Sequence, residues 1–421
     1  MQAKQNFRTS HNLLYFINLI MGMGTTVIFA VMPMMGRELQ LDQLEILLPF
    51  SDTPWQPKEL AITVFSAMST FVYTVTAPLW GRFSDRHGRK KAIQLGLVGY
   101  AIGSVIFCLA AGIGLRGAIT GISLYLLLLA TRAIAVLVNS ATQPASSAYI
   151  IDTSSVAKRA KNMGRIAASN QLGMMLGPLL AYTTVFGFIA PFAIHAGLML
   201  FASIIVWRWL PSIPIPERPD NSTGVNATFR DIRYRQLLLI FFLAFTMLGM
   251  CQQTLAFYIQ DLFQLTTKDA AKLYSQGMAY AALTTLISQL VLVPKIAGNP
   301  FRLVYFGLPL CLLGFITIAM AETPTILFIG NATLGGGIGL VGPGLTISAT
   351  FRVQPHEQGQ LSGMMTSCAA MGFVIGPLVG GFLYGLNIHA PYWFAAALIV
   401  PTTLYALTLT RAANAKSKLE I

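Results

Sequence analysis

The composition of this 421-residue chain excludes an ordinary soluble protein. The chain is 55% hydrophobic and only 10% charged, with a mean hydropathy of +0.64, whereas soluble proteins carry about 25% charged residues. A net charge of +13 is compatible with nucleic-acid binding, but no basic segment is long enough, or sufficiently interleaved with aromatic side chains, to favour that function. Lipid is therefore expected to be the solvent for much of the surface.

Twelve apolar runs are long enough, at about 20 residues each, to cross a bilayer. Backbone polar groups in lipid must be satisfied within the segment, so these runs favour helices. The predicted fold class is an all-α integral membrane protein with twelve transmembrane helices in two pseudo-symmetric six-helix bundles. The expected helices lie at 13–35, 59–80, 91–112, 121–151, 163–187, 191–210, 236–262, 270–294, 302–321, 324–351, 360–384 and 389–410.

The charges between these runs predict the orientation of the chain, because Lys and Arg are retained on the cytoplasmic side of membranes. With both termini and every second loop in the cytoplasm, only six of the 28 basic residues fall elsewhere: Arg37, Lys58, Arg116, Arg132, Lys268 and Lys272. The first apolar run is too long for a signal peptide and is expected to be an uncleaved anchor. The predicted location is a cell membrane, crossed many times, with both termini in the cytoplasm.

The densest basic segment is 81–91, Gly-Arg-Phe-Ser-Asp-Arg-His-Gly-Arg-Lys-Lys, which we expect to be a short cytoplasmic hairpin. Gly81 and Gly88 permit a tight turn, and Asp85 would be favoured near a helix N-terminus. Arg89 is expected to pair with Asp152 at the cytoplasmic end of the helix at 121–151. Two interpretations stay open: a latch between two conformational states, and a solvated turn that only fixes topology.

Arg132 is the only basic side chain deep inside a predicted helix. A charge there costs about 3 kcal/mol on insertion scales, so it is expected to face a cavity or a partner. Asn139 and Gln143 follow on the same helix face, and Asn18 and Thr25 form a similar face in the first helix. The other polar candidates for a substrate cavity are Gln171, Gln252, Gln253 and Asn331.

Each of these amides is equally compatible with a helix–helix hydrogen bond. No Asp or Glu lies in the middle of a predicted helix. A cavity that contains Arg132 and no acid is therefore expected to prefer anionic or neutral molecules.

The chain repeats a pattern at an offset of 199 residues. Gly164, Gly173, Gly177 and Pro178 are repeated as Gly363, Gly372, Gly376 and Pro377, and Pro144 as Pro343. The repeat predicts two six-helix halves, 1–210 and 236–421, joined by a cytoplasmic linker at 211–235 with a surface helix near Phe229–Arg235. Small residues spaced by four let helices approach closely, and proline weakens the helix beyond them. Close packing alone and a hinge are both consistent with this pattern.

These motifs resemble those of the major facilitator superfamily. Its loop between helices 2 and 3 runs Gly-x-Leu-Ala-Asp-Arg-x-Gly-Arg-Lys, and the matching positions are Gly81, Asp85, Arg86, Gly88, Arg89 and Lys90, with Phe83 and Ser84 departing. Gly173-x-x-x-Gly177-Pro178 is similar to the motif of the antiporter branch, although Leu180-Ala181 replaces its Gly-Gly. The helix 4 motif matches only at Leu128 and Arg132.

The resemblance implies a twelve-helix proton-coupled exporter of drugs or metabolites that works by alternating access. It implies no cofactor, with the proton gradient as energy source, and we expect a monomer in the lipid bilayer with a small-molecule substrate and no nucleic acid. The titratable candidates for proton coupling are Asp152, Asp261 and His195.

The direction and the cargo of transport stay open at this point. An anionic or neutral metabolite, including a carboxylate siderophore, and a drug are all compatible with the cavity, as is a facilitator or importer of an anionic metabolite. A membrane-embedded enzyme or lipid-handling protein would need a nucleophile–base pair or a metal cluster. The five histidines are scattered, so we expect no catalytic residues and no metal site.

Overall fold

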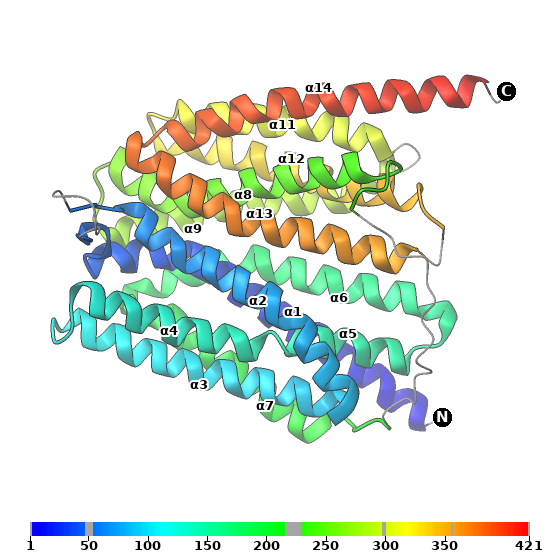
Figure 1. Cartoon of the computed structure of the whole chain (residues 1–421), viewed down its shortest axis with the longest axis horizontal. Helices are drawn as coiled ribbons and strands as arrows, with labels where there is room; N and C mark the ends of the chain where they lie inside the picture. Colours follow the sequence, from blue (N-terminus) through cyan, green and yellow to red (C-terminus); the bar gives the residue numbers. More distant parts are fainter. Residues whose placement is uncertain (1, 47–53, 215–228, 297–299, 355–356, 420–421) are drawn as a thin grey trace. The chain divides into compact units, whose positions relative to one another are not determined.

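The computed structural model describes residues 2–46, 54–214, 229–296, 300–354 and 357–419. The chain divides into two compact units, Met1–Ser222 and Thr223–Ile421. This division falls inside the segment that the sequence predicts to be a linker. Within the described residues the regular structure is helical, and β structure is limited to one isolated bridge between Ile46 and Trp55 (Figure 1).

The first unit contains seven α-helices and two short 3₁₀ segments within its described residues. They are α1 (Gln2–Glu38), η1 (Leu41–Gln43), α2 (Glu59–His87), α3 (Arg89–Leu115), α4 (Gly121–Asn139), α5 (Thr142–Thr153), α6 (Val156–Leu176), η2 (Gly177–Phe186) and α7 (Ala190–Trp209). A cluster of fully buried apolar side chains, including Ile17, Leu97, Tyr149 and Met199, joins α1, α3, α5 and α7.

The second unit also consists mainly of α-helices within its described residues. They are α8 (Arg235–Leu262), α9 (Thr267–Ile287), the π-helical turn η3 (Ser288–Leu292), α10 (Val293–Ile296), α11 (Pro300–Ala319), α12 (Pro324–Thr350), α13 (Gln358–Leu386) and α14 (Ala390–Leu419). Hydroxyl groups of α9 and η3 fasten this stretch to the glycine-rich middle of α12. Thr285 Oγ1 donates to the Gly335 carbonyl over 2.8 Å, and Ser288 Oγ donates to the Gly336 carbonyl over 3.0 Å.

The predicted fold class is confirmed. Among the described residues, ten helical segments are long and apolar enough to cross a membrane. The other two predicted spans correspond to α6 with η2 and to α14. The protein is therefore an all-α, multi-pass membrane protein.

The structure corrects two local predictions and adds a break to a third predicted element. The segment 81–91 is helical on both sides of Gly88, which alone turns the chain with φ 97°, a conformation open to glycine because it lacks a Cβ. The helix expected at 121–151 is one candidate membrane span, Gly121–Thr153, with a break at Ser140 and Ala141. The ring of Pro144 would clash with the carbonyl of Ser140, four residues earlier, and this explains the break. The expected surface helix near Phe229–Arg235 is a series of turns, and α8 begins at Arg235.

Candidate functional site

The Arg132 side chain lies inside the first unit, where it extends from α4 to α2 and α3. Its side chain is buried, with the whole residue only 3% exposed. Nη1 donates to the hydroxyl of Tyr100 over 3.2 Å, Nε lies 3.4 Å from Ser69 Oγ, and the guanidinium lies 5.8 Å from the centre of the Tyr100 ring. Within the described residues its hydrogen-bond partners are thus neutral hydroxyl groups, and no carboxylate forms an ion pair with it.

Tyr100 connects Arg132 to His195 of α7. The rings of Tyr100 and His195 meet edge to face, with their centres 5.2 Å apart. His195 Nε2 lies 3.0 Å from the carbonyl oxygen of Ile20 in α1, while Nδ1 is buried without a hydrogen-bond partner among the described residues. Gly24 makes room for this ring, because a Cβ there would lie 2.3 Å from a ring carbon. The sequence pattern did not predict this buried chain of arginine, tyrosine and histidine.

The two other candidates expected on this helix face, Asn139 and Gln143, have different surroundings. Gln143 lies beyond the helix break, in α5, where its side-chain oxygen accepts a hydrogen bond from the Tyr73 hydroxyl. Asn139 is 6% exposed, and its Oδ1 has no hydrogen-bond partner in the described part of the chain. Arg132 and Gln143 therefore both contact side chains of α2, although the break separates them.

The candidates in α1 and α6 are divided between buried and exposed positions. Asn18 is fully buried and donates to the Leu14 carbonyl over 2.8 Å, while Thr25 is exposed and donates to the Gly22 carbonyl. Gln171 is exposed in α6, and its neighbour Asn170 donates to the backbone oxygen of Asn18 over 3.3 Å.

The candidates in the second unit differ in their surroundings. Asn331 is buried and donates to the Leu327 carbonyl over 2.9 Å, and Gln253 is fully buried. Gln252 Oε1 is buried without a hydrogen-bond partner among the described residues. Asp261, a coupling candidate, accepts a hydrogen bond from the Tyr384 hydroxyl over 2.6 Å.

The predicted ion pair at the start of α3 is present. Arg89 Nε lies 3.0 Å from Asp152 Oδ2, and the Arg89 side chain is only 4% exposed. Arg89 also contacts Asp85, one turn earlier, and donates to Ser84 Oγ over 2.7 Å. Its role as a latch stays a prediction, as do the roles of the other motif residues. Of these, Gly81 lies within α2, Arg86 is exposed, and Lys90 donates to the Trp207 carbonyl.

The repeated glycines pack against the first helix of their own unit. A Cβ on Gly173 would lie 1.9 Å from the Leu19 oxygen of α1, and one on Gly177 would lie 2.1 Å from Thr26 Oγ1. In the second unit, a Cβ on Gly376 would lie 2.4 Å from the Thr246 oxygen of α8, and Gly372 approaches the same turn. Both pairs therefore let two helix backbones come close.

An ionic cluster before α8 was not predicted. Arg233 pairs with Asp231 at 2.7 Å and with Glu357 at 2.8 Å, and Arg352 donates to the Arg233 carbonyl over 2.8 Å. Hydrogen bonds from Arg233 lower the pKa of Asp231 and, in return, raise the pKa of Arg233. The sequence signal was present as four charged residues, but their distance along the chain concealed it.

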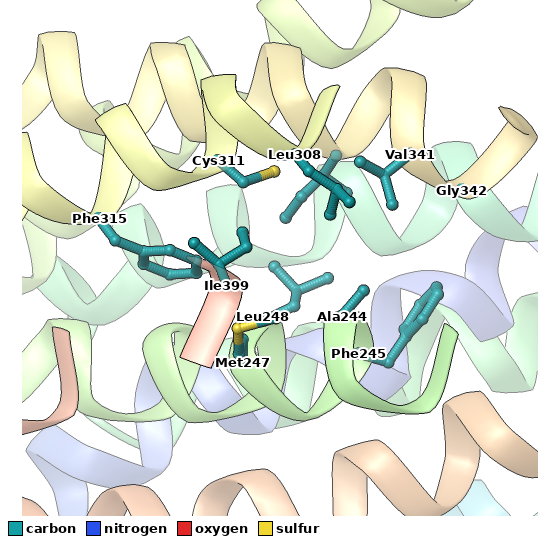
Figure 2. Close-up of a pocket in the computed structure, with 11 residues that line it drawn as sticks. Ala244, Phe245, Met247, Leu248, Leu308, Cys311, Phe315, Val341, Gly342 and Ile399 are labelled. Atoms are coloured by element: carbon teal, nitrogen blue, oxygen red, sulfur yellow. The ribbon is translucent and has the colours of Figure 1, made fainter. Parts of the chain in front are cut away.

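Figure 2 shows a small apolar cavity in the second unit, about 30 Å³ in volume. Phe245 and Met247 of α8, Phe315 of α11 and Val341 of α12 line it. Ligand pockets usually measure about 300–1,000 Å³, and an apolar cavity of this size is expected to stay dry. This cavity is therefore too small and too apolar for a polar cargo. The candidate site is the Arg132 cluster, because its buried guanidinium contacts neutral hydroxyl groups among the described residues.

Comparisons with known proteins agree with this architecture. The model of the Major Facilitator Superfamily matches residues 14–373. Multidrug resistance protein 2 of Bacillus subtilis is 26% identical over 340 residues, which cover 77% of this chain and 80% of that protein. The class B tetracycline resistance protein of Escherichia coli is 22% identical over 95% of this chain and 94% of its own length. The solved structure of the E. coli xylose transporter XylE superimposes with a TM-score of 0.68 at 12% identity, covering 96% of this chain and 98% of that one.

Proposed function

Because this chain belongs to the Major Facilitator Superfamily, a family of membrane transporters and not of enzymes, we propose that it exports a small anionic or neutral molecule by alternating access, driven by the proton gradient. Relatives named for multidrug and tetracycline resistance support export. We further propose that it works as a monomer in the inner membrane of a bacterium, with both termini in the cytoplasm.

The observation that carries the choice of cargo is the uncompensated charge of Arg132. A guanidinium has five N–H donors, and the contacts of Arg132 within the described residues are with two neutral hydroxyl groups. A buried charge without a counter-charge is costly. A carboxylate or another anionic group of the cargo would offset that cost, and its two oxygens match the fork of the guanidinium.

The proton site remains one of three candidates. Asp152 is engaged by Arg89, and Asp261 is engaged by Tyr384. His195 has a ring nitrogen without a hydrogen-bond partner in the described part of the chain, and Tyr100 separates it from Arg132. His195 is thus the candidate nearest to the proposed cargo site.

A second candidate function is import of an anionic metabolite on the same fold, and the proximity of His195 to Arg132 favours it. An anion bound at Arg132 would favour a proton on His195, because each partly cancels the charge of the other. Reciprocal linkage then makes the proton and the anion bind together. Such cooperation supports symport, whereas antiport requires that the two compete.

The experiment has two stages. Metabolite profiles of the medium and the cells of a deletion strain are compared with those of the parent strain, and an exporter leaves its cargo trapped inside the mutant cells. The identified cargo is then added to vesicles containing the purified protein, and proton movement is recorded. In antiport, protons move in the direction opposite to the cargo, and in symport they move in the same direction. A transport rate that does not change with an imposed pH gradient would refute proton coupling.

A further inference from the structure

A second, larger cavity lies on the first unit, in a groove between α3 and α7. Its volume is about 510 Å³. Four small residues keep the groove open, namely Gly112, Ala193, Ala196 and Gly197. A Cβ built on Gly197 would meet no other atom within 4 Å, so the groove is empty of side chains at that point.

The groove faces lipid and has the length of one leaflet. The apolar residues on its rims, Val105, Leu109 and Leu200, are 45%, 63% and 42% exposed on membrane-spanning helices. The stretch of α3 from Val105 to Arg116 rises by about 16 Å, and half of a hydrocarbon core measures about 15 Å. An empty groove would forfeit dispersion contacts on both walls, so an acyl chain is the natural filling.

Arg116 stands at one end of the groove, one residue beyond the end of α3. Its side chain is exposed and forms no hydrogen bond or ion pair with the described residues. The remaining lining residues are uncharged. A free cation at the end of a leaflet-long apolar groove is complementary to a lipid that carries a negative headgroup on its chain.

We propose that this groove binds one anionic phospholipid, with an acyl chain between α3 and α7 and the phosphate at Arg116. The headgroup contact adds selectivity to a chain contact that every lipid can make. One basic residue near a membrane surface is expected to favour an anionic lipid about fivefold.

The test titrates the full-length, delipidated protein in detergent with phosphatidylglycerol or with phosphatidylcholine of the same chains, and bound lipid is counted by native mass spectrometry. The wild-type protein should bind phosphatidylglycerol about fivefold more tightly than phosphatidylcholine. Arg116→Gln should abolish that preference, weakening phosphatidylglycerol binding more than phosphatidylcholine binding, because the choline cation already offsets the phosphate charge in phosphatidylcholine. Lys268→Gln removes the same charge at the start of α9 and should change neither.

A second variant tests the chain contact separately. Gly197→Leu places a side chain into the open groove and should weaken the binding of both lipids at this site. Equal binding of the two lipids by the wild-type protein, or a preference that survives Arg116→Gln, would overturn the proposal. Arg116 is exposed, so its variant tests the proposal even where Gly197→Leu fails to fold.

Discussion

Arg132 and Asn331 occupy the same position of the repeat, 199 residues apart, yet they do different things. The Arg132 side chain extends from α4 to Ser69 of α2 and Tyr100 of α3, whereas Asn331 donates a hydrogen bond to the Leu327 carbonyl of its own helix. The repeat therefore preserves the helices but not the chemistry. The charged part of the candidate site belongs to the first unit, and its counterpart in the second unit is neutral.

The prolines of the repeat show the same asymmetry. Pro178 stands where α6 gives way to the 3₁₀ segment η2, while α13 runs through Pro377 without interruption. Pro178 cannot bond to the Met174 carbonyl, and Thr26 Oγ1 of α1 donates to that carbonyl over 2.9 Å instead. Similarly, a break precedes Pro144 in the first unit, whereas α12 continues through Pro343. At these two repeated prolines, only the helices of the first unit are interrupted.

The largest expected effect comes from the Arg89–Asp152 ion pair of the first unit. Asp152→Asn removes the more buried of the two carboxylates that pair with Arg89 and leaves only the half-exposed Asp85, which should lower the free energy of unfolding by about 3 kcal/mol. Glu357→Gln in the second unit removes a partner of Arg233, whose side chain is 42% exposed, and should cost less than about 1 kcal/mol. Thermal and denaturant unfolding of the purified protein measure both losses.

The double variant Arg89→Gln/Asp152→Asn is the control for this prediction. It should recover much of the loss, because it removes the unpaired charge as well as the pair. Equal losses for Asp152→Asn and Glu357→Gln would show that the Arg89–Asp152 and Arg233–Glu357 ion pairs stabilise the protein equally.

Next in size is the effect of Arg132 on transport. Arg132→Gln should lower the transport of an anionic cargo about 100-fold, equivalent to about 2.7 kcal/mol. Asn331→Ala removes one local hydrogen bond and should lower it by no more than about fivefold. Initial rates in vesicles that contain equal amounts of each variant measure the difference. Arg132→Lys keeps the charge but loses the fork, so an intermediate rate is expected, and unimpaired transport by Arg132→Gln would refute the proposed site.

Sequence patterns predicted the membrane helices well, because a bilayer demands long apolar runs whatever the tertiary contacts are. They also predicted the Arg89–Asp152 contact, since both residues lie at helix ends on the same predicted side. The Tyr100–His195 contact was beyond them, because its two residues stand on separate helices without a shared spacing. Sequence patterns also could not predict that Pro178 ends an α-helix while Pro377 does not. Both prolines follow the same Gly-x-x-x-Gly pattern, and the hydrogen bond from Thr26 to the Met174 carbonyl depends on the folded unit.

A smaller effect is expected at the repeated glycines. Gly173→Ala and Gly376→Ala each push a methyl group into a neighbouring backbone and should lower the free energy of unfolding by about 1–3 kcal/mol. Gly164 and Gly363 are matched controls, because they share the same repeat offset and a Cβ on either meets no atom within 4 Å. Alanine at those two positions should stabilise the protein slightly. Equal thermal midpoints for all four variants would contradict the close helix contacts.

The smallest effect is a pH dependence confined to the second unit. Arg233 holds the pKa of Asp231 below its ordinary value of 3.8. A lowered pKa in the folded state stabilises the protein above the pKa of the unfolded chain, and this contribution disappears as the pH falls through the folded value. The protection factor for hydrogen exchange in the first turn of α8, which corrects for the intrinsic pH dependence of exchange, should therefore fall below about pH 4. Added salt should weaken the effect because Arg233 is partly exposed.

Asp231→Asn removes the titrating group and should flatten that pH profile, while Asp152→Asn in the first unit should leave it unchanged. If the pH profile of hydrogen exchange is unaltered in Asp231→Asn, another acidic residue must stabilise the segment before α8. In that case the contrast between a buried ion pair in one unit and an exposed cluster in the other would rest on Glu357 alone, because it is the second carboxylate that Arg233 contacts in the described part of the chain.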